Sequence, residues 1–497
     1  MDTNPGQVSS DSRDTISRRD FGRGSAGLLL AAGITASRSA NAAADARPRR
    51  HAIVGVGHRS HLYQTAIQKT YADHLELVAA ADVNMGRLHV ASEFARKNGR
   101  EPPKLYLAHD FDKLVAETKP EVVIVTTVDG FHHEYICRAM QLGCDVLTEK
   151  PLTIDAEKCK QILDTRRSTG RRLRVAFNYR YTPVRTQVKE LLMSGTIGDV
   201  LSVDFHWMLD THHGADYFRR WHSQKKLSGG LMVHKATHHF DLVNWWLSAV
   251  PVSVRATGKR DFYTPAMARR LGLTGPHERC RTCPEKSKCA FELDISKVEE
   301  LKTLYLDNEQ YDGYFRDRCV FRPDIDIEDT MNLAVTYDND VSMSYSLNAF
   351  TGWEGYVIVF NGTKGRLEHK MEEAVMLGAD VKTPSGSTLK GDGTYIRVYP
   401  MRKPAYQVPA RTSEGGHGGG DEVMLADLFA PNRPADPCLR AADERSGAYS
   451  ILTGIAANHC FLTGQTTKIA DLVPNIGRPD YPTMPSHLAA LGMPPKV

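Results

Sequence analysis

The sequence has few cysteines, little net charge and no apolar run long enough to cross a membrane. Nine cysteines in 497 residues are too few for a scaffold held together by disulfides. The formal net charge is only +4, and no basic stripe with interleaved aromatic residues is present, which argues against a nucleic-acid-binding surface. With 41% hydrophobic and 25% charged residues, the composition excludes a disordered, collagenous or polytopic membrane protein and indicates two or three globular domains.

The first 44 residues resemble an export signal. Residues 17–21 read Ser-Arg-Arg-Asp-Phe, and an apolar stretch follows at residues 24–36, shorter than the roughly 20 residues that span a bilayer. Small residues at 40–44 suit cleavage. We predict a twin-arginine signal over residues 1–44, read by the twin-arginine export machinery, and a periplasmic or otherwise exported protein without membrane insertion. The alternative is a disordered tail that happens to contain two arginines.

After the predicted signal, short apolar strands alternate with helices as far as residue 177. This alternation is typical of a parallel sheet covered by helices on both faces. The expected strands are 52–56, 75–81, 121–126, 145–147 and 174–177. The expected helices are 61–71, 85–98, 132–142 and 155–168.

From residue 173 to 497 the pattern changes to alternating apolar and polar residues. Residues 331–337 and 341–347 flank Asp338-Asn339-Asp340 and predict a hairpin with one buried face. We expect a second, α+β domain with an open, mainly antiparallel sheet. A charged, cysteine-bearing insertion at about 258–325 interrupts it.

A glycine turn follows the first strand. Gly55 and Gly57 would let the backbone approach a pyrophosphate, and the helix that begins at Ser60, where a third glycine is usual, offers free N–H groups. Glycines also serve ordinary tight turns, so the turn by itself is weak evidence.

Asp82 ends the second strand, where an acid would bind ribose hydroxyls and repel a 2′-phosphate. The alternative for Asp82 is a helix cap. The sequence predicts NAD, with NADP as the alternative because Arg59 and Arg87 lie nearby. Since the twin-arginine route carries folded proteins, we expect this cofactor to be loaded before export and held tightly.

Lys150 follows Glu149 at the carboxyl end of an expected parallel strand, where ligands bind in open α/β sheets. A lysine there can exchange a proton with an alcohol or a carbonyl. A surface lysine is the alternative for the Glu149-Lys150-Pro151 tripeptide taken alone.

Together these segments resemble the Gfo/Idh/MocA oxidoreductase family. The resemblance is carried by the glycine turn, Thr126–His132, Glu149-Lys150-Pro151, Asn178-Tyr179-Arg180 and the Gly229–Asp241 segment. It implies a Rossmann domain at 49–172, a C-terminal substrate and oligomerisation domain, a homo-oligomer, and hydride transfer between a nicotinamide and a sugar or cyclitol.

The resemblance also implies site residues. Carried across, Lys150 and His238 would be the catalytic pair, and His234 is a further candidate beside them. The cofactor residues would be Gly55, Gly57, His58, Arg59, Ser60, Asp82, Thr127, His132, Glu149 and Lys150. Histidines and aromatic residues before the Gly229–Asp241 segment also suit a sugar by residue type, so the expected substrate residues are Arg180, His213, Trp221 and His238. A loop packed on the sheet is the alternative for His213 and Trp221.

His234 stands where the family has an aspartate. An imidazole cannot orient His238 as a carboxylate would. If His234 and His238 lie one turn apart on one helix, they face the same side and can share a proton. A two-histidine metal site and simple helix packing of His234 are the alternatives.

Four cysteines are concentrated in the insertion. Cys280, Cys283, Cys289 and Cys319 have a spacing that resembles a four-cysteine metal site, and we predict one structural zinc. An iron–sulfur cluster and two disulfides are the alternatives.

Three functions remain open from the sequence. The first is an exported NAD(P)-dependent oxidoreductase acting on a saccharide, cyclitol or glycoside. The second is a glycosidase that uses bound NAD in an oxidation–elimination–reduction cycle without net redox change. The third is a sugar-binding protein without activity.

Overall fold

A computed structural model describes residues 47–376, 382–384, 393–413, 415–433, 435–485 and 490–495. From Arg47 onward the chain forms one compact unit. The predicted signal over residues 1–44 lies outside the described residues. None of the helices in the described part of the chain is long and apolar enough to cross a membrane.

The first sheet has seven strands in the order β16-β6-β5-β4-β1-β2-β3. All neighbouring strands are parallel except β16, which pairs antiparallel with β6. The strands are β1 (Arg49–Val54), β2 (Leu75–Asp82), β3 (Lys104–Leu107), β4 (Val122–Val125), β5 (Asp145–Thr148), β6 (Leu173–Val175) and β16 (Ala442–Asp443).

Helices cover both faces of this sheet because its strands are apolar on both sides. One core cluster joins alternate strand residues to α3, α4 and α5, and the other joins the remaining residues to α1, α2 and α14. The helices are α1 (Ser60–Thr65), which continues as a π-helix (Ala66–Thr70), α2 (Met85–Lys97), α3 (Phe111–Thr118), α4 (His132–Gln141), α5 (Ala156–Thr169) and α14 (Gly420–Phe429). The parallel sheet predicted from the sequence is confirmed.

The second sheet follows the order β15-β14-β12-β11-β7-β10-β9-β8-β17, with β13 paired to β12. It is antiparallel except for the pair β7–β10. The predicted mainly antiparallel sheet, including its hairpin β9–β10, is therefore confirmed. The strands are β7 (Val200–Asp210), β8 (Pro251–Lys259), β9 (Thr330–Tyr337), β10 (Ser342–Thr351), β11 (Trp353–Gly362), β12 (Gly365–Met376), β13 (Lys382–Pro384), β14 (Tyr395–Pro400), β15 (Tyr406–Val408) and β17 (Thr467–Lys468).

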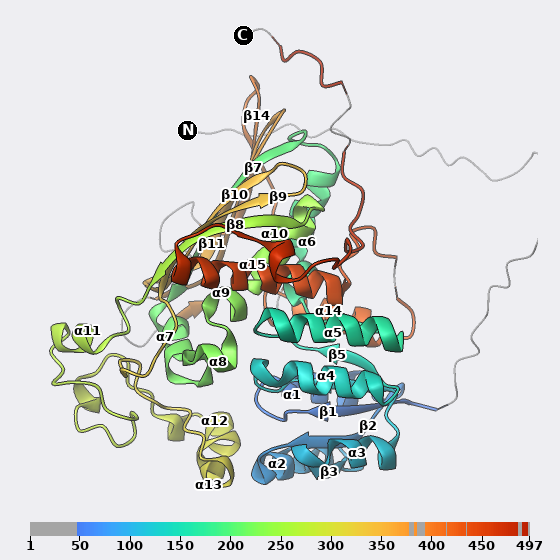
Figure 1. Ribbon diagram of the computed structural model, residues 1–497, viewed down its shortest axis with the longest axis vertical. Helices are drawn as coiled ribbons and strands as arrows, with labels where there is room; N and C mark the ends of the chain where they lie inside the picture. Colours follow the sequence, from blue (N-terminus) through green and yellow to red (C-terminus); the bar gives the residue numbers. More distant parts are fainter. Residues whose placement is uncertain are drawn as a thin grey trace, which may run out of the picture. The chain divides into compact units, whose positions relative to one another are not determined.

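One face of the second sheet packs on helices and the other is polar. Phe205 and Trp207 of β7 are fully buried in the core, whereas their neighbours His206 and Asp204 face outward. Helix α15 packs on β8 and α10 and also on α5 and β6, so it joins the two sheets (Figure 1). The helices are α6 (Pro183–Met193), α7 (Thr211–Arg219), α8 (Lys225–Ser228), α9 (Leu231–His234), α10 (Thr237–Leu247), α15 (Glu444–Thr463) and α16 (Ile469–Leu472).

The boundary between the two halves differs from the sequence expectation. Strand β6 belongs to the first sheet although it begins at Leu173, and β16 and α14 return to that sheet from the C-terminal half. The insertion lies between the adjacent strands β8 and β9 and contains α11 (Pro265–Arg270), α12 (Glu299–Leu304) and α13 (Glu309–Asp312).

Candidate active site

The glycine turn after β1 packs against the turn after β4. Gly55 has a φ of +88°, and a Cβ atom here would lie 2.7 Å from the backbone of Thr126 and Thr127. Only glycine allows both this conformation and this approach. The Ser60 hydroxyl donates to the Gly57 carbonyl oxygen at 2.6 Å and closes the turn. The predicted cofactor turn therefore lies where parallel strands end, the usual ligand edge of such sheets.

Asp82 lies at the same edge, and its carboxylate is bound largely by the protein itself. Oδ2 accepts the Val56 N–H at 2.7 Å, while Oδ1 accepts the Asn84 N–H at 2.8 Å and Arg87 at 2.9 Å. Oδ2 keeps a lone pair for a ribose hydroxyl. Arg87 also pairs with Asp312 at 2.6 Å. Asp82 and Asp312 thus share the guanidinium of Arg87, which leaves a net negative charge. This charge favours the ribose hydroxyls of NAD over the 2′-phosphate of NADP.

Part of the insertion lies over this corner. We call residues 299–312, which include α12 and α13, the clamp. The Tyr305 hydroxyl accepts the His58 N–H at 3.1 Å, and Asn84 Nδ2 donates to the Asn308 carbonyl oxygen at 2.9 Å. A Cβ atom on Gly86 would lie 1.8 Å from Asn308 Oδ1, so this contact depends on glycine. Figure 1 shows α12 and α13 beside α2. The clamp therefore covers the glycine turn and the start of α2.

Arg59 connects the glycine turn to the end of β5. Its Nε donates to Glu149 Oε1 at 2.7 Å, and the Tyr63 hydroxyl donates to the same oxygen at 2.7 Å. Glu149 is buried, so its carboxylate is engaged by the protein. The Glu149–Arg59 pair fixes the position of the neighbouring Lys150.

Lys150 contacts an aspartate–histidine pair. Its Nζ lies 3.4 Å from His234 Nε2 and donates to the His234 carbonyl oxygen at 3.2 Å. His234 Nδ1 lies 2.5 Å from Asp129 Oδ2. Because Lys150 donates toward Nε2, the single proton of a neutral imidazole is assigned to Nδ1, facing Asp129. Asp129 was not among the predicted residues, and it supplies the carboxylate missing at position 234.

The expected continuous helix through His234 and His238 is wrong. Helix α9 ends at His234 and α10 begins at Thr237, so the i, i+4 geometry is lost. His234 faces Asp129 and Lys150, whereas His238 stacks on the Tyr179 ring with centroids 4.0 Å apart. The two imidazoles therefore belong to different groups of side chains and do not share a proton.

The charge state of Lys150 follows from its surroundings. Burial lowers the pKa of Lys150 to about 8, although the charges of Asp129 and Glu149 oppose this effect. Burial and the charge of Lys150 lower the pKa of His234 and of His238 well below the ordinary value for histidine. Near neutral pH, Lys150 therefore changes protonation while both imidazoles are neutral.

Lys235 places a second ammonium in this region. Only 4% of the residue is exposed, and Nζ lies 4.8 Å from the Trp207 ring centroid. Nζ also donates to the Tyr179 hydroxyl at 3.3 Å. In the described part of the chain, no carboxylate lies within ion-pair distance of Lys235. The cation–π contact with Trp207 and the hydrogen bond to Tyr179 therefore hold its ammonium group in place.

Two further carboxylate–imidazole pairs border the same region. Glu354 Oε1 lies 2.6 Å from His213 Nδ1, and the Tyr217 hydroxyl lies 3.0 Å from His213 Nε2. Asp421 Oδ2 lies 2.8 Å from His417 Nδ1. His213 was predicted, but Glu354, His417 and Asp421 were not.

Three other predicted residues, Arg180, Trp221 and His132, differ in whether they lie next to the site. Arg180 cannot contact a substrate: its side chain is 0% exposed and binds Asp241 through two hydrogen bonds of 2.6 and 2.7 Å. Trp221 stacks on His222 and lies edge-on to His234 at 5.7 Å, so it borders the site. The His132 ring lies between the carbonyl oxygens of Pro151 and Thr127, at 2.8 and 3.1 Å, and holds these two loops together.

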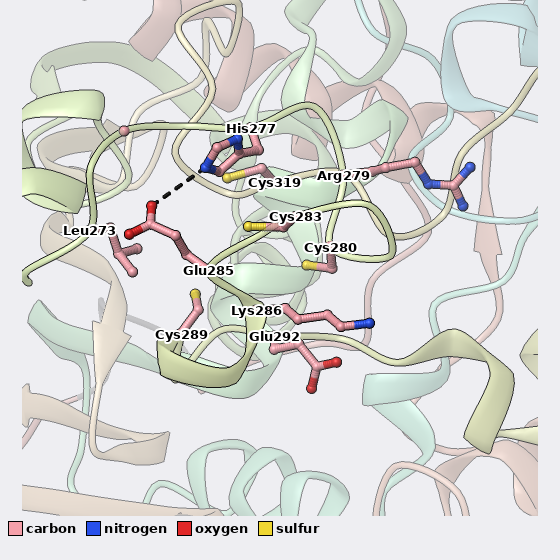
Figure 2. A pocket seen from close by; sticks show the side chains of 11 residues that line it. Leu273, His277, Arg279, Cys280, Cys283, Glu285, Lys286, Cys289, Glu292 and Cys319 are labelled. Carbon is pink, nitrogen blue, oxygen red and sulfur yellow. Dashed lines mark hydrogen bonds and ion pairs between the residues drawn. The ribbon is translucent and has the colours of Figure 1, made fainter.

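The four insertion cysteines line one small cavity. Figure 2 shows them together with His277 and Glu285. The cavity has a volume of about 20 Å³, roughly the room for one water molecule. No group of three or more His, Cys, Asp or Glu side chains in the described ranges is arranged to hold a metal ion, and all nine cysteines are free thiols. The structure therefore does not support the predicted zinc. It does not show the alternative disulfides either.

Comparison with known proteins identifies both halves. A family model described as "Oxidoreductase family, NAD-binding Rossmann fold" (GFO_IDH_MocA) matches residues 49–177. The model for the C-terminal alpha/beta domain of that family matches residues 189–468.

Individual relatives agree with this result. The oxidoreductase YteT of Bacillus subtilis is 35% identical over 395 residues, which cover 78% of this chain and 90% of YteT. An inositol 2-dehydrogenase/D-chiro-inositol 3-dehydrogenase of Lactiplantibacillus plantarum is 26% identical over 43% of this chain and 56% of its own. The WlbA dehydrogenase of Bordetella pertussis, solved with NADH and UDP-GlcNAcA, has the same fold with a TM-score of 0.55 and 18% identity, over 85% of this chain and 99% of WlbA.

Proposed function

This chain belongs to the Gfo/Idh/MocA oxidoreductase family, and we propose that it is an exported enzyme that moves a hydride between a tightly held NAD and a saccharide, cyclitol or glycoside. Family membership makes it an NAD(P)-dependent oxidoreductase with an NAD-binding Rossmann domain. The observation that supports the specific proposal best is the half-buried Lys150, whose backbone N–H donates to Glu149 and whose Nζ contacts His234, next to the glycine turn that Arg59 links to Glu149.

The residues around the glycine turn fit a dinucleotide. Gly55, Gly57 and the N–H groups before α1 would hold the pyrophosphate, and Asp82 Oδ2 would accept a ribose hydroxyl. When bound, the nicotinamide ring accepts a hydride from an alcohol or returns it to a ketone. The clamp supports tight retention, because it contacts the glycine turn through Tyr305 and the start of α2 through Asn308, and a cofactor held beneath it would leave only after these residues move away.

Lys150 acts as the base toward the substrate hydroxyl. Its neutral amine takes the hydroxyl proton as the hydride leaves the same carbon, and the resulting ammonium donates to His234 Nε2. Asp129 keeps the His234 Nδ1–H oriented, so the Nε2 lone pair stays directed at Lys150. In the reverse direction, the Lys150 ammonium protonates the nascent alkoxide.

Asp129→Asn is expected to move the pH profile of alcohol oxidation to lower pH. The base form of Lys150 is required, so activity rises with pH through about 8 in the wild type. Burial raises the pKa of Asp129 well above the ordinary value for a carboxyl, and the charge of Lys150 opposes this effect. The charge of Asp129 in turn raises the pKa of Lys150, so its removal lowers the pKa of Lys150. The measurement is kcat/KM against pH, with Asp112→Asn as the control because Asp112 is exposed and pairs with Arg138. An unchanged or upward-shifted midpoint would contradict the assignment.

Polyhydroxylated substrates suit the groups that border Lys150. His213 and Trp221 combine a hydrogen-bonding ring with an apolar face, as sugar sites do. One relative is, by its name, an inositol dehydrogenase, and a protein of the same fold was solved in complex with a nucleotide sugar. The test is to mix gel-filtered protein with myo-inositol, methyl D-glucosides or a uronic acid and follow the absorbance of reduced nicotinamide. At least one probe should reduce the cofactor, and failure of all classes would reject the proposed substrate range.

Export and assembly complete the proposal. The Arg18-Arg19 pair motivates export, and cell fractionation of an Arg18→Lys/Arg19→Lys variant should find the protein retained in the cytoplasm.

The outward polar face of the second sheet, which includes His206, Arg255 and Asn332, is proposed as the contact of a homo-oligomer. Light scattering after size exclusion should then give a mass above 55.3 kDa.

A further inference from the structure

The glycine-rich loop at residues 415–420 brings one histidine toward the proposed active site. His417 has a φ of +53°, a conformation that non-glycine residues rarely adopt, and Gly415, Gly418 and Gly419 also have positive φ. The loop is packed closely on residues 178–182: a Cβ atom on Gly420 would lie 2.6 Å from the Asn178 carbonyl oxygen. The structure therefore constrains His417 to a defined position.

Asp421 orients the His417 ring. Its Oδ2 lies 2.8 Å from His417 Nδ1, and the carboxylate is 6% exposed. Asn178 Nδ2 donates to the other oxygen at 2.7 Å, and Arg59 binds it at 3.3 Å. Burial raises the pKa of Asp421, but the His417 hydrogen bond and the charge of Arg59 outweigh this and hold the pKa below its ordinary value. An ionised Asp421 accepts the Nδ1–H and leaves the lone pair on Nε2.

The free side of His417 lies next to the proposed substrate residues. Its ring centroid is 5.7 Å from that of Tyr179, which stacks on His238. The side chain is 38% exposed, and Nε2 has no hydrogen-bond partner in the described part of the chain. Lys150 reaches this region from β5, whereas His417 reaches it from a loop more than two hundred residues later.

We propose that His417, held by Asp421, is a second acid–base residue of the site and acts on a different substrate atom from Lys150. This inference rests on the proposed function. Once the substrate hydroxyl has become a carbonyl, the C–H on the neighbouring carbon is acidic. His417 Nε2 takes that proton, and the C–H electron pair moves to the carbonyl oxygen to give an enolate. Return of a proton from His417⁺ restores the ketone, with no net change in redox state.

The test measures deuterium uptake from solvent at the carbon next to the oxidised carbon. Wild type, His417→Gln, Lys150→Ala and the control His459→Gln are each incubated in D₂O with the probe among myo-inositol, methyl D-glucosides and a uronic acid that reduces the wild-type cofactor. His459 lies on α15, outside the proposed site, and its Nδ1 is 2.9 Å from the Thr467 hydroxyl on β17. His417→Gln should reduce the bound cofactor within a few-fold of the wild-type rate but lose deuterium uptake by about 10²-fold, the scale of a positioned acid–base group. Lys150→Ala should lose both.

The outcomes separate this inference from the proposed function. If His417→Gln takes up deuterium at the wild-type rate, the role of His417 is wrong and the proposed function stands. A loss of cofactor reduction as large as that in Lys150→Ala would also overturn the inference, because the two residues would then serve one proton. If no probe reduces the wild-type cofactor, the proposed function and the inference both fail.

Discussion

Lys150→Ala is expected to lower kcat by about 10²-fold or more, with little change in Tm or in bound NAD. Within the residues that the structure describes, the side chain forms hydrogen bonds with His234 alone. Its loss therefore removes the base without removing a link to the cofactor turn, which depends on Glu149 and Arg59. Steady-state kinetics, thermal melting and cofactor content measured on one preparation check the three parts of this prediction.

Lys150→Arg separates proton transfer from charge. Arginine keeps the positive charge but does not release a proton near neutral pH. If Lys150 is the base, Lys150→Arg should be as inactive as Lys150→Ala. An arginine variant within a few-fold of wild type would show that only the charge is required, and it would remove Lys150 from the role of base.

Removal of the clamp contacts is expected to make the protein lose its NAD. The double variant Tyr305→Ala/Asp312→Ala removes the acceptor on the His58 N–H and one of the two carboxylates on Arg87. Each contact of this kind contributes about 1–3 kcal/mol, and 1.4 kcal/mol corresponds to about tenfold in an equilibrium constant. NAD dissociation should therefore be about 10- to 100-fold faster, because differences in affinity lie mostly in koff.

The matched control for the clamp is Tyr406→Ala. Tyr406 is an exposed tyrosine on β15 that no clamp residue contacts. Dissociation is followed by displacement of bound NAD with excess labelled NAD. Equal rates in the clamp variant and in the wild type would show that residues 299–312 do not retain the cofactor.

Local features of the fold and the site were predictable from the sequence. The glycine turn and Asp82 depend on neighbouring residues and on strand ends that hydrophobic periodicity marks. The hairpin β9–β10 was predictable because its turn residues separate two alternating runs. The return of α14 and β16 to the first sheet was not predictable, since it joins segments that are hundreds of residues apart.

The carboxylate–histidine pairs of the site were likewise not predictable from the sequence. Asp129 and His234 are 105 positions apart, and His213 and Glu354 are 141 apart, so no local pattern connects them. His417 and Asp421 are only four apart, but the surrounding glycines indicate a loop and give no sign that it packs on Asn178 and Thr182. The break between α9 and α10 was missed because Lys235 and Ala236 are both good helix formers.

The central claim is that this oxidoreductase works with a cofactor that it does not release. Extensive gel filtration of the wild-type protein, followed by denaturation and mass spectrometry of the released ligand, tests it most directly. The account predicts NAD(H) at about one per chain, and reduction of that cofactor by a saccharide or cyclitol without added NAD. A cofactor-free protein whose activity rises from zero only with added NAD(P) would contradict it.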